Sequence, residues 1–470
     1  MKNFLKIFVL AMMMTFANQE NIFAEPIPLR GVIEGFYGEQ WTFSDREDLM
    51  TFCRENKLNA YIYAPKDDLY HRSKWREPYP AEKISALKNL VATAKANGVR
   101  FIFAVSPGQD LNYKGKKGDA DFNSMMQKFE AVYQIGVRDF AIFFDDLKDD
   151  KGNHREDGKI QAEFINKVQN ELRNNHKDIG QIFTVPTEYF LQDMQKRPGK
   201  INSYTEDFAK NLDKKIVVLF TGDGVVCDGI SEETLAEVNK IFNRQVGIWW
   251  NYPVNDYAVT DGGNKSAKLA LGAIEKLPAE NVQAIFFNPM NQPLLSRIAL
   301  ATGADYANNP ANYNPETSWK KAIKNQFGEL SSAMKIFAEH SQHMENSWAK
   351  VGAADGQNFN TLAYLVLYNF KAGKNLETSA LEKEIDSMEN AAEILLSKLP
   401  EKILSECKPQ LEQFKKISQA DKLAVQSLKT KNLDSRLKTL REEIKSKESS
   451  AILSEKSALK FLDDVINLLK

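Results

Sequence analysis

This chain of 470 residues has few cysteines, almost no net charge and few long hydrophobic runs. Its three cysteines, Cys53, Cys227 and Cys407, are odd in number and too far apart for a disulfide framework or a metal-binding motif. At most one disulfide is possible, and we expect buried thiols that pack as small hydrophobic groups. A net charge of −1 gives no indication of binding to nucleic acid or to an anionic membrane.

The most pronounced apolar run lies near the N-terminus, over residues 7–16, and two lysines, Lys2 and Lys6, precede it as a short basic region. This run is shorter than the roughly 20 residues that a membrane-spanning helix needs. Small residues at Ala17 and Ala24 are suitable cleavage points. We therefore predict that residues 1–24 are a secretory signal peptide. We expect an exported protein, secreted or periplasmic, with no integral membrane segment after cleavage.

Short apolar runs then recur along the chain, and each ends in polar residues. Most of these runs are continuously apolar, which is typical of parallel strands that are covered on both faces. The predicted strands are residues 29–35, 60–64, 101–105, 140–144, 181–185, 216–220, 246–250 and 282–287.

Helical patterns separate the predicted strands. Residues 44–47 read as a capping box that opens a helix running to about residue 56. Gly98 and Gly136 follow helical segments at the position that favours glycine. These two helices span 82–97 and 121–135, and further helices are predicted at 158–174, 204–212, 232–242, 266–277 and 294–306. Eight alternating βα units within residues 25–314 predict a catalytic (β/α)8 TIM barrel of the α/β class.

The character of the sequence changes near residue 315, where strand signals end. Patterns rich in Leu, Ala, Glu and Lys predict an all-α helical C-terminal domain over residues 315–470. In one of its segments an apolar stripe recurs at spacings of three and four, formed by Leu381, Ile385, Met388 and Ala392. The helices predicted here are 318–339, 360–370, 380–398 and 433–447.

In a TIM barrel the active site is built from the residues that follow the carboxyl ends of the strands. Here those positions combine carboxylates, amides and aromatic rings, a mixture that suits the hydroxyls and the C–H face of a sugar. The residues concerned include Gly35, Lys66, Asp145, Asp146, Tyr189, Trp249, Trp250, Asn251, Asp256 and Asn288.

Asp145 and Asp146 follow the fourth predicted strand without a spacer. Their closeness disfavours double ionisation, so we expect one protonated and one ionised carboxyl, as acid-assisted glycoside cleavage requires. A helix cap or a solvated loop is the commoner explanation for such a pair, and a Mg²⁺ site is another, although no phosphate-binding glycine loop accompanies it. Neighbouring acids are poorly placed to attack an anomeric carbon from opposite faces, which favours a nucleophile within the substrate, such as a 2-acetamido oxygen.

An ordered set of motifs across the predicted barrel resembles the family 84 glycoside hydrolases, which include O-GlcNAcases and bacterial β-N-acetylglucosaminidases. Each motif alone is weak, but the set is specific. The motifs are RGVIEGFYG at 30–38, YIYAPKDD at 61–68, PGQD at 107–110, FFDD at 143–146, PTEY at 186–189, TGD at 221–223, WWNYPVNDY at 249–257 and NPM at 288–290. Val185 departs from relatives that carry Cys before the PTEY motif.

The resemblance implies retaining, substrate-assisted hydrolysis of terminal β-linked N-acetylglucosamine (GlcNAc) through an oxazoline, with no metal or organic cofactor. Asp145 would polarise the acetamido group, Asp146 would be the general acid and then the base, and Tyr189 would steady the acetamido group. The Gly35 backbone, Lys66, Asp256 and Asn288 would hold the sugar hydroxyls, and Trp249, Trp250 and Asn251 would shape the pocket. The implied partners are GlcNAc-containing glycans or glycoproteins.

Two other functions stay open at this point: a hyaluronidase-type endoglycosidase and a non-catalytic carbohydrate-binding protein on the same scaffold. The oligomeric state is also open.

Several residues have simpler structural interpretations. One of the two tryptophans at 249–250 is expected to pack in the core, and Lys66 alone could pair with a neighbouring acid at 67–68. We expect solvated loop charges at 67–68 and 149–150, and a structural role for Glu34. His340 and His343 are three apart on a predicted helix, where a surface position is favoured over a zinc site.

Overall fold

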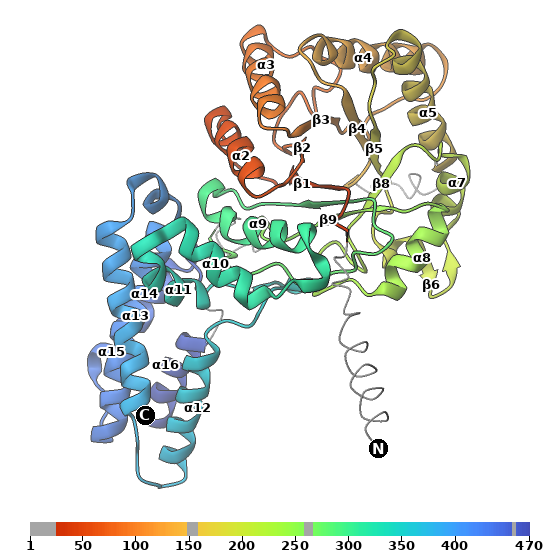
Figure 1. The fold of residues 1–470 in the computed structure, drawn as a ribbon. Helices are drawn as coiled ribbons and strands as arrows, with labels where there is room; N and C mark the ends of the chain where they lie inside the picture. Colours follow the sequence, from red (N-terminus) through yellow and green to blue (C-terminus); the bar gives the residue numbers. More distant parts are fainter. Residues whose placement is uncertain (1–24, 148–157, 258–266, 454–456) are drawn as a thin grey trace, which may run out of the picture.

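The computed structural model describes residues 25–147, 158–257, 267–453 and 457–470. The predicted signal peptide and the acids at 149–150 lie outside these ranges. Eight parallel strands close into a barrel in the order β1-β10-β9-β8-β5-β4-β3-β2, seen in the upper part of Figure 1. Every predicted strand is present, with bounds that differ by at most two residues. The strands are β1 Leu29–Glu34, β2 Ala60–Tyr63, β3 Arg100–Val105, β4 Asp139–Phe143, β5 Ile182–Val185, β8 Val217–Phe220, β9 Gly247–Trp250 and β10 Ala284–Phe287.

The alternation of side chains along the strands divides the barrel into two layers. Inward residues such as Ile33, Ile62 and Phe183 form a small core inside the barrel. Outward residues such as Val32 and Ile142 pack beneath the surrounding helices. These helices are α2 Phe43–Glu55, α3 Ala81–Ala96, α4 Gly115–Gln134, α5 Gly158–Asn175, α7 Ser203–Asn211, α8 Glu232–Phe242 and α9 Pro293–Asn308.

The first barrel helix begins earlier than predicted. Its N-cap is Thr42, whose hydroxyl accepts a hydrogen bond from the backbone N–H of Asp45, while the Asp45 carboxylate accepts one from the Thr42 N–H. The capping box is therefore 42–45 and not 44–47: Thr42 and Asp45 have the three-residue spacing of the motif two residues earlier in the chain. Gly98 and Gly136 have φ angles of +69° and +108°, as expected where helices end at glycine.

The helix predicted over residues 266–277 is wrong. In its place, residues 267–277 run without regular secondary structure between the barrel and the helical region, and most of their side chains are buried. Tertiary partners replace the helical hydrogen bonds: the Leu271 N–H donates to the Ser341 carbonyl (2.7 Å), and the Gly272 N–H donates to the Tyr252 hydroxyl (2.8 Å). Once tertiary partners satisfy the backbone N–H groups, the segment no longer needs helical hydrogen bonds, and apolar side chains that are buried on all sides do not favour a helix.

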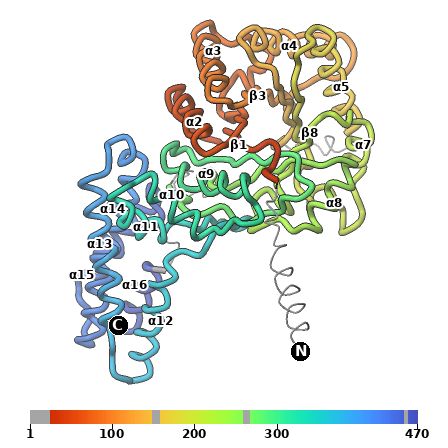
Figure 2. The backbone as a smooth tube through the Cα atoms, in the orientation of Figure 1, coloured from red at the N-terminus to blue at the C-terminus, as the bar shows by residue number. Residues whose placement is uncertain are grey.

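A predominantly helical region follows the barrel, as predicted, and the tube in Figure 2 shows it lying beside the barrel. The stripe of four apolar residues on α13 is fully buried there. The predicted helix 318–339 is divided at Gly328, which has φ +54° and ends α10. The helices are α10 Pro315–Phe327, α11 Ser331–Glu339, α12 Gln357–Lys371, α13 Ser379–Lys398, α14 Glu401–Thr430, α15 Ser435–Lys447 and α16 Ser457–Leu468.

Some elements were not predicted. The helix α14 is 30 residues long although it contains Pro409, a residue that argues against an uninterrupted helix. The hairpin formed by β11 (Met344–Glu345) and β12 (Lys350–Val351) lies between α11 and α12. No helix among the described residues has both the length and the apolar character needed to cross a bilayer.

Candidate active site

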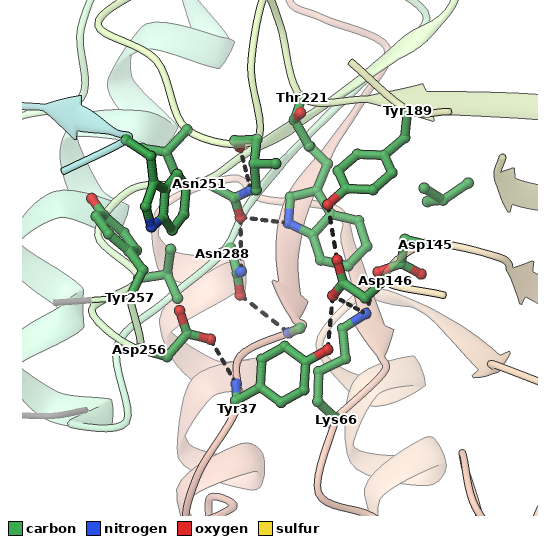
Figure 3. A pocket seen from close by; sticks show the side chains of 17 residues that line it. Tyr37, Lys66, Asp145, Asp146, Tyr189, Thr221, Asn251, Asp256, Tyr257 and Asn288 are labelled. Atoms are coloured by element: carbon green, nitrogen blue, oxygen red, sulfur yellow. Dashed lines mark hydrogen bonds and ion pairs between the residues drawn. The ribbon is translucent and has the colours of Figure 1, made fainter. Parts of the chain in front are cut away.

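A cavity of about 400 Å³ opens at the carboxyl ends of the barrel strands (Figure 3). This volume lies in the range typical of small-molecule sites. The structure brings nine of the ten predicted site residues together around it: Gly35, Lys66, Asp145, Asp146, Tyr189, Trp249, Asn251, Asp256 and Asn288.

The two vicinal acids share one lysine. The Lys66 ammonium donates a hydrogen bond to Asp145 Oδ2 and lies 3.5 Å from Asp146 Oδ2. Asp145 is 4% exposed, and its Oδ1 atom has no hydrogen-bond partner among the described residues. Asp145 therefore places one occupied and one unoccupied acceptor oxygen beside the pocket.

Two tyrosines hold the carboxylate of Asp146 from opposite sides, as Figure 3 shows. The Tyr37 hydroxyl donates to Oδ2 at 2.8 Å, and the Tyr189 hydroxyl donates to Oδ1 at 2.9 Å. The backbone of Asp146 is in the left-handed region, with φ +54°. For a residue other than glycine this conformation costs energy and persists only where the surroundings hold it.

The pKa values of the two acids are shifted in opposite directions. Burial raises the pKa of Asp145, with Lys66 opposing and Asp146 adding to the shift. Burial also opposes ionisation of Asp146, but Lys66 and the hydroxyls of Tyr37 and Tyr189 outweigh it, so the pKa of Asp146 is lowered. The opposite directions of these two shifts favour ionisation of Asp146 over ionisation of Asp145.

A chain of hydrogen bonds fixes the other side of the pocket. Asn251 Oδ1 accepts hydrogen bonds from the Trp249 indole N–H and from the Asn288 amide, both at 2.9 Å. Asn288 Oδ1 in turn accepts the backbone N–H of Gly35 at 3.1 Å. A Cβ atom at Gly35 would lie 2.2 Å from the Trp249 ring, so glycine is required for this approach.

Asp256 closes the ring of polar groups on the side away from Asp146 (Figure 3). Its Oδ2 atom accepts the backbone N–H of Tyr37 at 2.7 Å, which anchors the loop after β9 to the loop after β1. The pocket therefore has carboxylates on two sides and amides between them, a distribution that suits several hydroxyls of one sugar ring.

Residues 30–339 match the family model described as beta-N-acetylglucosaminidase. The chain belongs to this family of glycoside hydrolases. Residues 363–462 match a model described as hyaluronidase post-catalytic domain-like. The resemblance to family 84 that the motifs carry is thereby confirmed.

Relatives of known sequence or structure agree with this assignment. The Protein O-GlcNAcase of Mus musculus is 34% identical over 232 residues, which are 49% of this chain and 25% of the relative. The chain thus matches about a quarter of the length of that curated relative. The solved structure of CpGH84B is 35% identical with a TM-score of 0.83, covering 94% of this chain and 77% of its own. An O-GlcNAc hydrolase variant of Thermobaculum terrenum is 29% identical with a TM-score of 0.81, covering 93% and 94%.

One predicted site residue of this family member lies outside the pocket. Trp250 is fully buried in the outer layer of the barrel, and it does not line the cavity, whereas Trp249 does. The assignment of Trp250 to substrate contact is therefore wrong. Adjacent residues of a strand point to opposite faces, so one of the two had to point away from the site.

The structure confirms the expected role of one charged residue near the strand ends and corrects that of another. Glu34 is a buried structural partner of Arg46, as expected, and Lys66 pairs with Asp145 and Asp146, not with its neighbours. Asp68 is not a solvated charge, because it is 1% exposed and bonded to the Tyr63 hydroxyl (2.7 Å) and to Lys83 (2.8 Å).

The expected surface pair of histidines is also wrong. His340 is 2% exposed at the end of α11, and His343 lies beyond that helix. The cysteines are free thiols; Cys53 and Cys407 are buried, and Cys227 is partly exposed.

Three aromatic residues that line the pocket were given no role from the sequence: Tyr37, Tyr257 and Trp348. Tyr37 and Tyr257 lie in the quoted motifs that continue past the ends of β1 and β9. This position after a strand was the signal that could have indicated a place in the site. Trp348 lies in the β11–β12 hairpin, is 59% exposed and packs against Tyr257 with ring centroids 5.7 Å apart. No sequence pattern connects this hairpin to the mouth of the barrel.

Proposed function

We propose that this protein is a retaining exo-β-N-acetylglucosaminidase that hydrolyses terminal β-linked GlcNAc by substrate-assisted catalysis. The observation that carries the proposal is the Oδ1 atom of Asp145, a buried acceptor without a partner among the described residues, on a residue that lines the pocket. A buried lone pair gains most from a donor such as an amide N–H, because it has already lost its hydration. The acetamido N–H of GlcNAc is such a donor.

The reaction then proceeds in two steps. Asp145 accepts the acetamido N–H, and the acetamido carbonyl oxygen attacks the anomeric carbon while the glycosidic C–O bond breaks. Asp146 gives a proton to the departing oxygen, which leaves as an alcohol, and the sugar is left as an oxazoline protonated on nitrogen, whose N–H stays hydrogen-bonded to the ionised Asp145. In the second step Asp146 takes a proton from water, which attacks the anomeric carbon and opens the ring of the oxazoline, so that the configuration is retained overall.

Binding of substrate also supplies the protonation states that this sequence of steps needs. An N–H donated to Asp145 favours its ionised form and lowers its pKa. The ionised Asp145 and the exclusion of water both raise the pKa of Asp146. Both changes favour a proton on Asp146, the group that must act as the acid, over a proton on Asp145.

The shape of the pocket supports exo action. Loops after β1, β8 and β9 surround the cavity, and the β11–β12 hairpin adds Trp348 at its edge. A cavity of about 400 Å³ bounded in this way suits one terminal sugar better than the interior of a polymer. The predicted signal peptide supports action outside the cytoplasm, on GlcNAc-containing glycans or glycoproteins.

The test is release of 4-methylumbelliferone from its β-N-acetylglucosaminide by the wild type and by Asp145→Asn and Asp146→Asn. We expect turnover by the wild type and losses on the order of 10²- to 10⁴-fold in each variant, the usual size of a general acid–base or charge-stabilising contribution. A folded wild type that binds GlcNAc without turnover would indicate a carbohydrate-binding protein. Cleavage of hyaluronan but not of the terminal sugar would indicate the endoglycosidase.

A further inference from the structure

Arg72 lies behind the pocket wall, in the loop that follows β2, and it does not line the cavity. Its Nη1 donates to the Tyr37 hydroxyl at 2.8 Å, and its Nη2 donates to the backbone carbonyl oxygen of Asp146 at 3.2 Å. The guanidinium also lies 5.3 Å from the centre of the Tyr37 ring. One side chain thus contacts both the main chain of Asp146 and a group that binds its carboxylate.

The bonding of Arg72 differs from that of two other arginines in the barrel. Arg46 makes two bonds to the Glu34 carboxylate (2.8 and 2.6 Å), and Arg76 makes two to Asp121 (2.6 and 2.7 Å). Within the described ranges Arg72 has no carboxylate within 4.0 Å, and its buried Nε has no partner. Paired carboxylates give the strongest bonds to arginine, so the position of Arg72 is poorly explained by fold stability alone.

Arg72 also fixes the direction of the hydrogen bond between Tyr37 and Asp146. A guanidinium has donors and no acceptor, so the Tyr37 oxygen must accept from Arg72. The hydroxyl hydrogen is then directed to Asp146 Oδ2, 2.8 Å away. Without Arg72 the hydroxyl could rotate, and this donor to the carboxylate would no longer be fixed.

The backbone of Asp146 gives a second reason for a partner at this point. Asp146 has a left-handed φ of +54°, and its carbonyl oxygen accepts a hydrogen bond from Arg72. Such a conformation costs on the order of 1–3 kcal/mol for a non-glycine residue unless neighbouring groups hold it. The Arg72 bond is made to the strained residue itself.

We propose that Arg72 is a positioning residue for Asp146, holding its left-handed backbone and orienting the Tyr37 hydroxyl so that the carboxyl stays aimed at the pocket for both proton transfers. The inference rests on the proposed function, because it assigns Arg72 to the acid–base group of that reaction.

The charged and titratable groups around Asp146 allow a prediction for the loss of Arg72. Lys66, Tyr37, Tyr189 and Asp145 face the carboxyl together with Arg72. Replacing Arg72 by an uncharged residue removes one positive charge and the donor that orients the Tyr37 hydroxyl, while the other groups stay. The pKa of Asp146 should therefore rise, and the basic limb of the pH profile of kcat/KM should move upward.

The experiment compares Arg72→Met with Arg76→Met, a control four residues along the same loop whose arginine pairs with Asp110 and Asp121. Each variant is assayed on aryl β-N-acetylglucosaminides with a good and a poor leaving group, across pH, after thermal unfolding has confirmed folding. We expect Arg72→Met to lose about 10-fold or more on the poor leaving group and at most a few-fold on the good one, since acid assistance matters more for the former. Arg72→Lys should recover part of this loss.

A non-additivity test completes the design. In an Asp146→Asn background, Arg72→Met should cause little further loss, because the group it positions is already disabled. In the control Arg76→Met we expect any loss to be equal on both leaving groups, with an unmoved basic limb. The same pattern in Arg72→Met would overturn the positioning role while leaving the proposed function intact. Absence of turnover in the wild type would instead overturn the proposed function, and this inference with it.

Discussion

Asp145 in the barrel and Asp421 in the helical region are both buried acids whose pKa burial raises. Their surroundings differ. Asp145 is bonded to Lys66, adjoins Asp146 and lines a cavity. Neither carboxylate oxygen of Asp421 has a hydrogen-bond partner within the described part of the chain, and Asp421 does not line the cavity at the strand ends.

The difference shows which features indicate chemistry. Burial and a raised pKa occur at both positions, so these two features alone do not identify a site. The barrel adds convergence, because the carboxyl ends of parallel strands meet at one edge and bring polar groups from distant parts of the sequence together. Asp421 lies inside the long helix α14, where no such convergence occurs.

Among the variants that test this comparison, the largest expected effect is at Gly35. In Gly35→Ala the new Cβ would lie 2.2 Å from the Trp249 ring, so the ring or the β1 loop must move into the space for the sugar. We expect kcat/KM to fall by about 100-fold, the scale of a displacement of about 1 Å in a catalytic site. Steady-state kinetics on the methylumbelliferyl substrate measures this loss.

The matched control is Gly229→Ala, in the loop after β8, where no heavy atom lies within 4 Å of the added Cβ. This control should keep full activity. Normal kinetics in Gly35→Ala would show that the wall between Gly35 and Trp249 is not part of the sugar site.

The next effect concerns stability in the helical region. Asp421→Leu should raise the free energy of unfolding by about 1–3 kcal/mol at pH 7, the usual cost of an unsatisfied buried polar group. Burial raises the pKa of Asp421 in the folded state. The free energy of unfolding of the wild type is therefore highest below the pKa of the unfolded carboxyl, and it falls as pH rises through the pKa of the folded state. The advantage of Asp421→Leu should therefore grow from pH 4 to pH 7 in chemical denaturation.

Asp386→Leu is the control for this change, since Asp386 is 67% exposed on the neighbouring helix α13. It should alter stability by less than about 0.5 kcal/mol. Activity should stay normal in both variants; a lower stability of Asp421→Leu would contradict the absence of a partner for this acid.

Trp348 is the point at which the helical region reaches the barrel site, and it gives a smaller effect. Its exposed ring at the edge of the pocket can pack against the aglycone, the part of the substrate on the far side of the cleaved bond. Trp348→Ala should raise KM for a GlcNAc-bearing peptide by roughly 5- to 10-fold, the value of one aromatic contact, with kcat nearly unchanged. A Michaelis–Menten series on a glycopeptide measures it.

Tyr364→Ala provides the comparison, because Tyr364 is 67% exposed on α12 and lines no part of the pocket. Its KM should equal that of the wild type. An equal rise in both variants would place the aglycone contact elsewhere.

The sequence was sufficient for the barrel strands and for most of the pocket, for a physical reason. Strands buried on both faces are continuously apolar, and the residues that follow them must be polar where a solvated site forms, so both signals are local. Trp250 shows where this argument stops, since the face to which a strand residue points depends on register with the neighbouring strands. Tyr37 shows the same limit, because its role depends on Asp146, which is 109 residues away.

The parts that were predicted wrongly depend on contacts between distant segments. Residues 267–277 have a helical apolar pattern, but partners such as Ser341 and Tyr252 satisfy their backbone in an irregular conformation. Trp348 reaches the pocket only because the helical region packs beside the barrel. Such outcomes follow from tertiary packing, which propensity and periodicity do not contain.

The smallest expected effect tests that packing at Glu406. From α14, its carboxylate accepts the backbone N–H groups of Leu294 (3.1 Å) and Leu295 (2.8 Å), so a residue of the helical region caps the barrel helix α9. Glu406→Ala should lower the free energy of unfolding by about 1 kcal/mol, as loss of an N-cap does, whereas Glu412→Ala, at an exposed position of the same helix, should change it little. Because α9 follows the loop that carries Asn288, a rise in KM that accompanies the loss in Glu406→Ala would show that the helical region supports the sugar site as well as the fold. An unchanged KM would confine the contribution of Glu406 to stability.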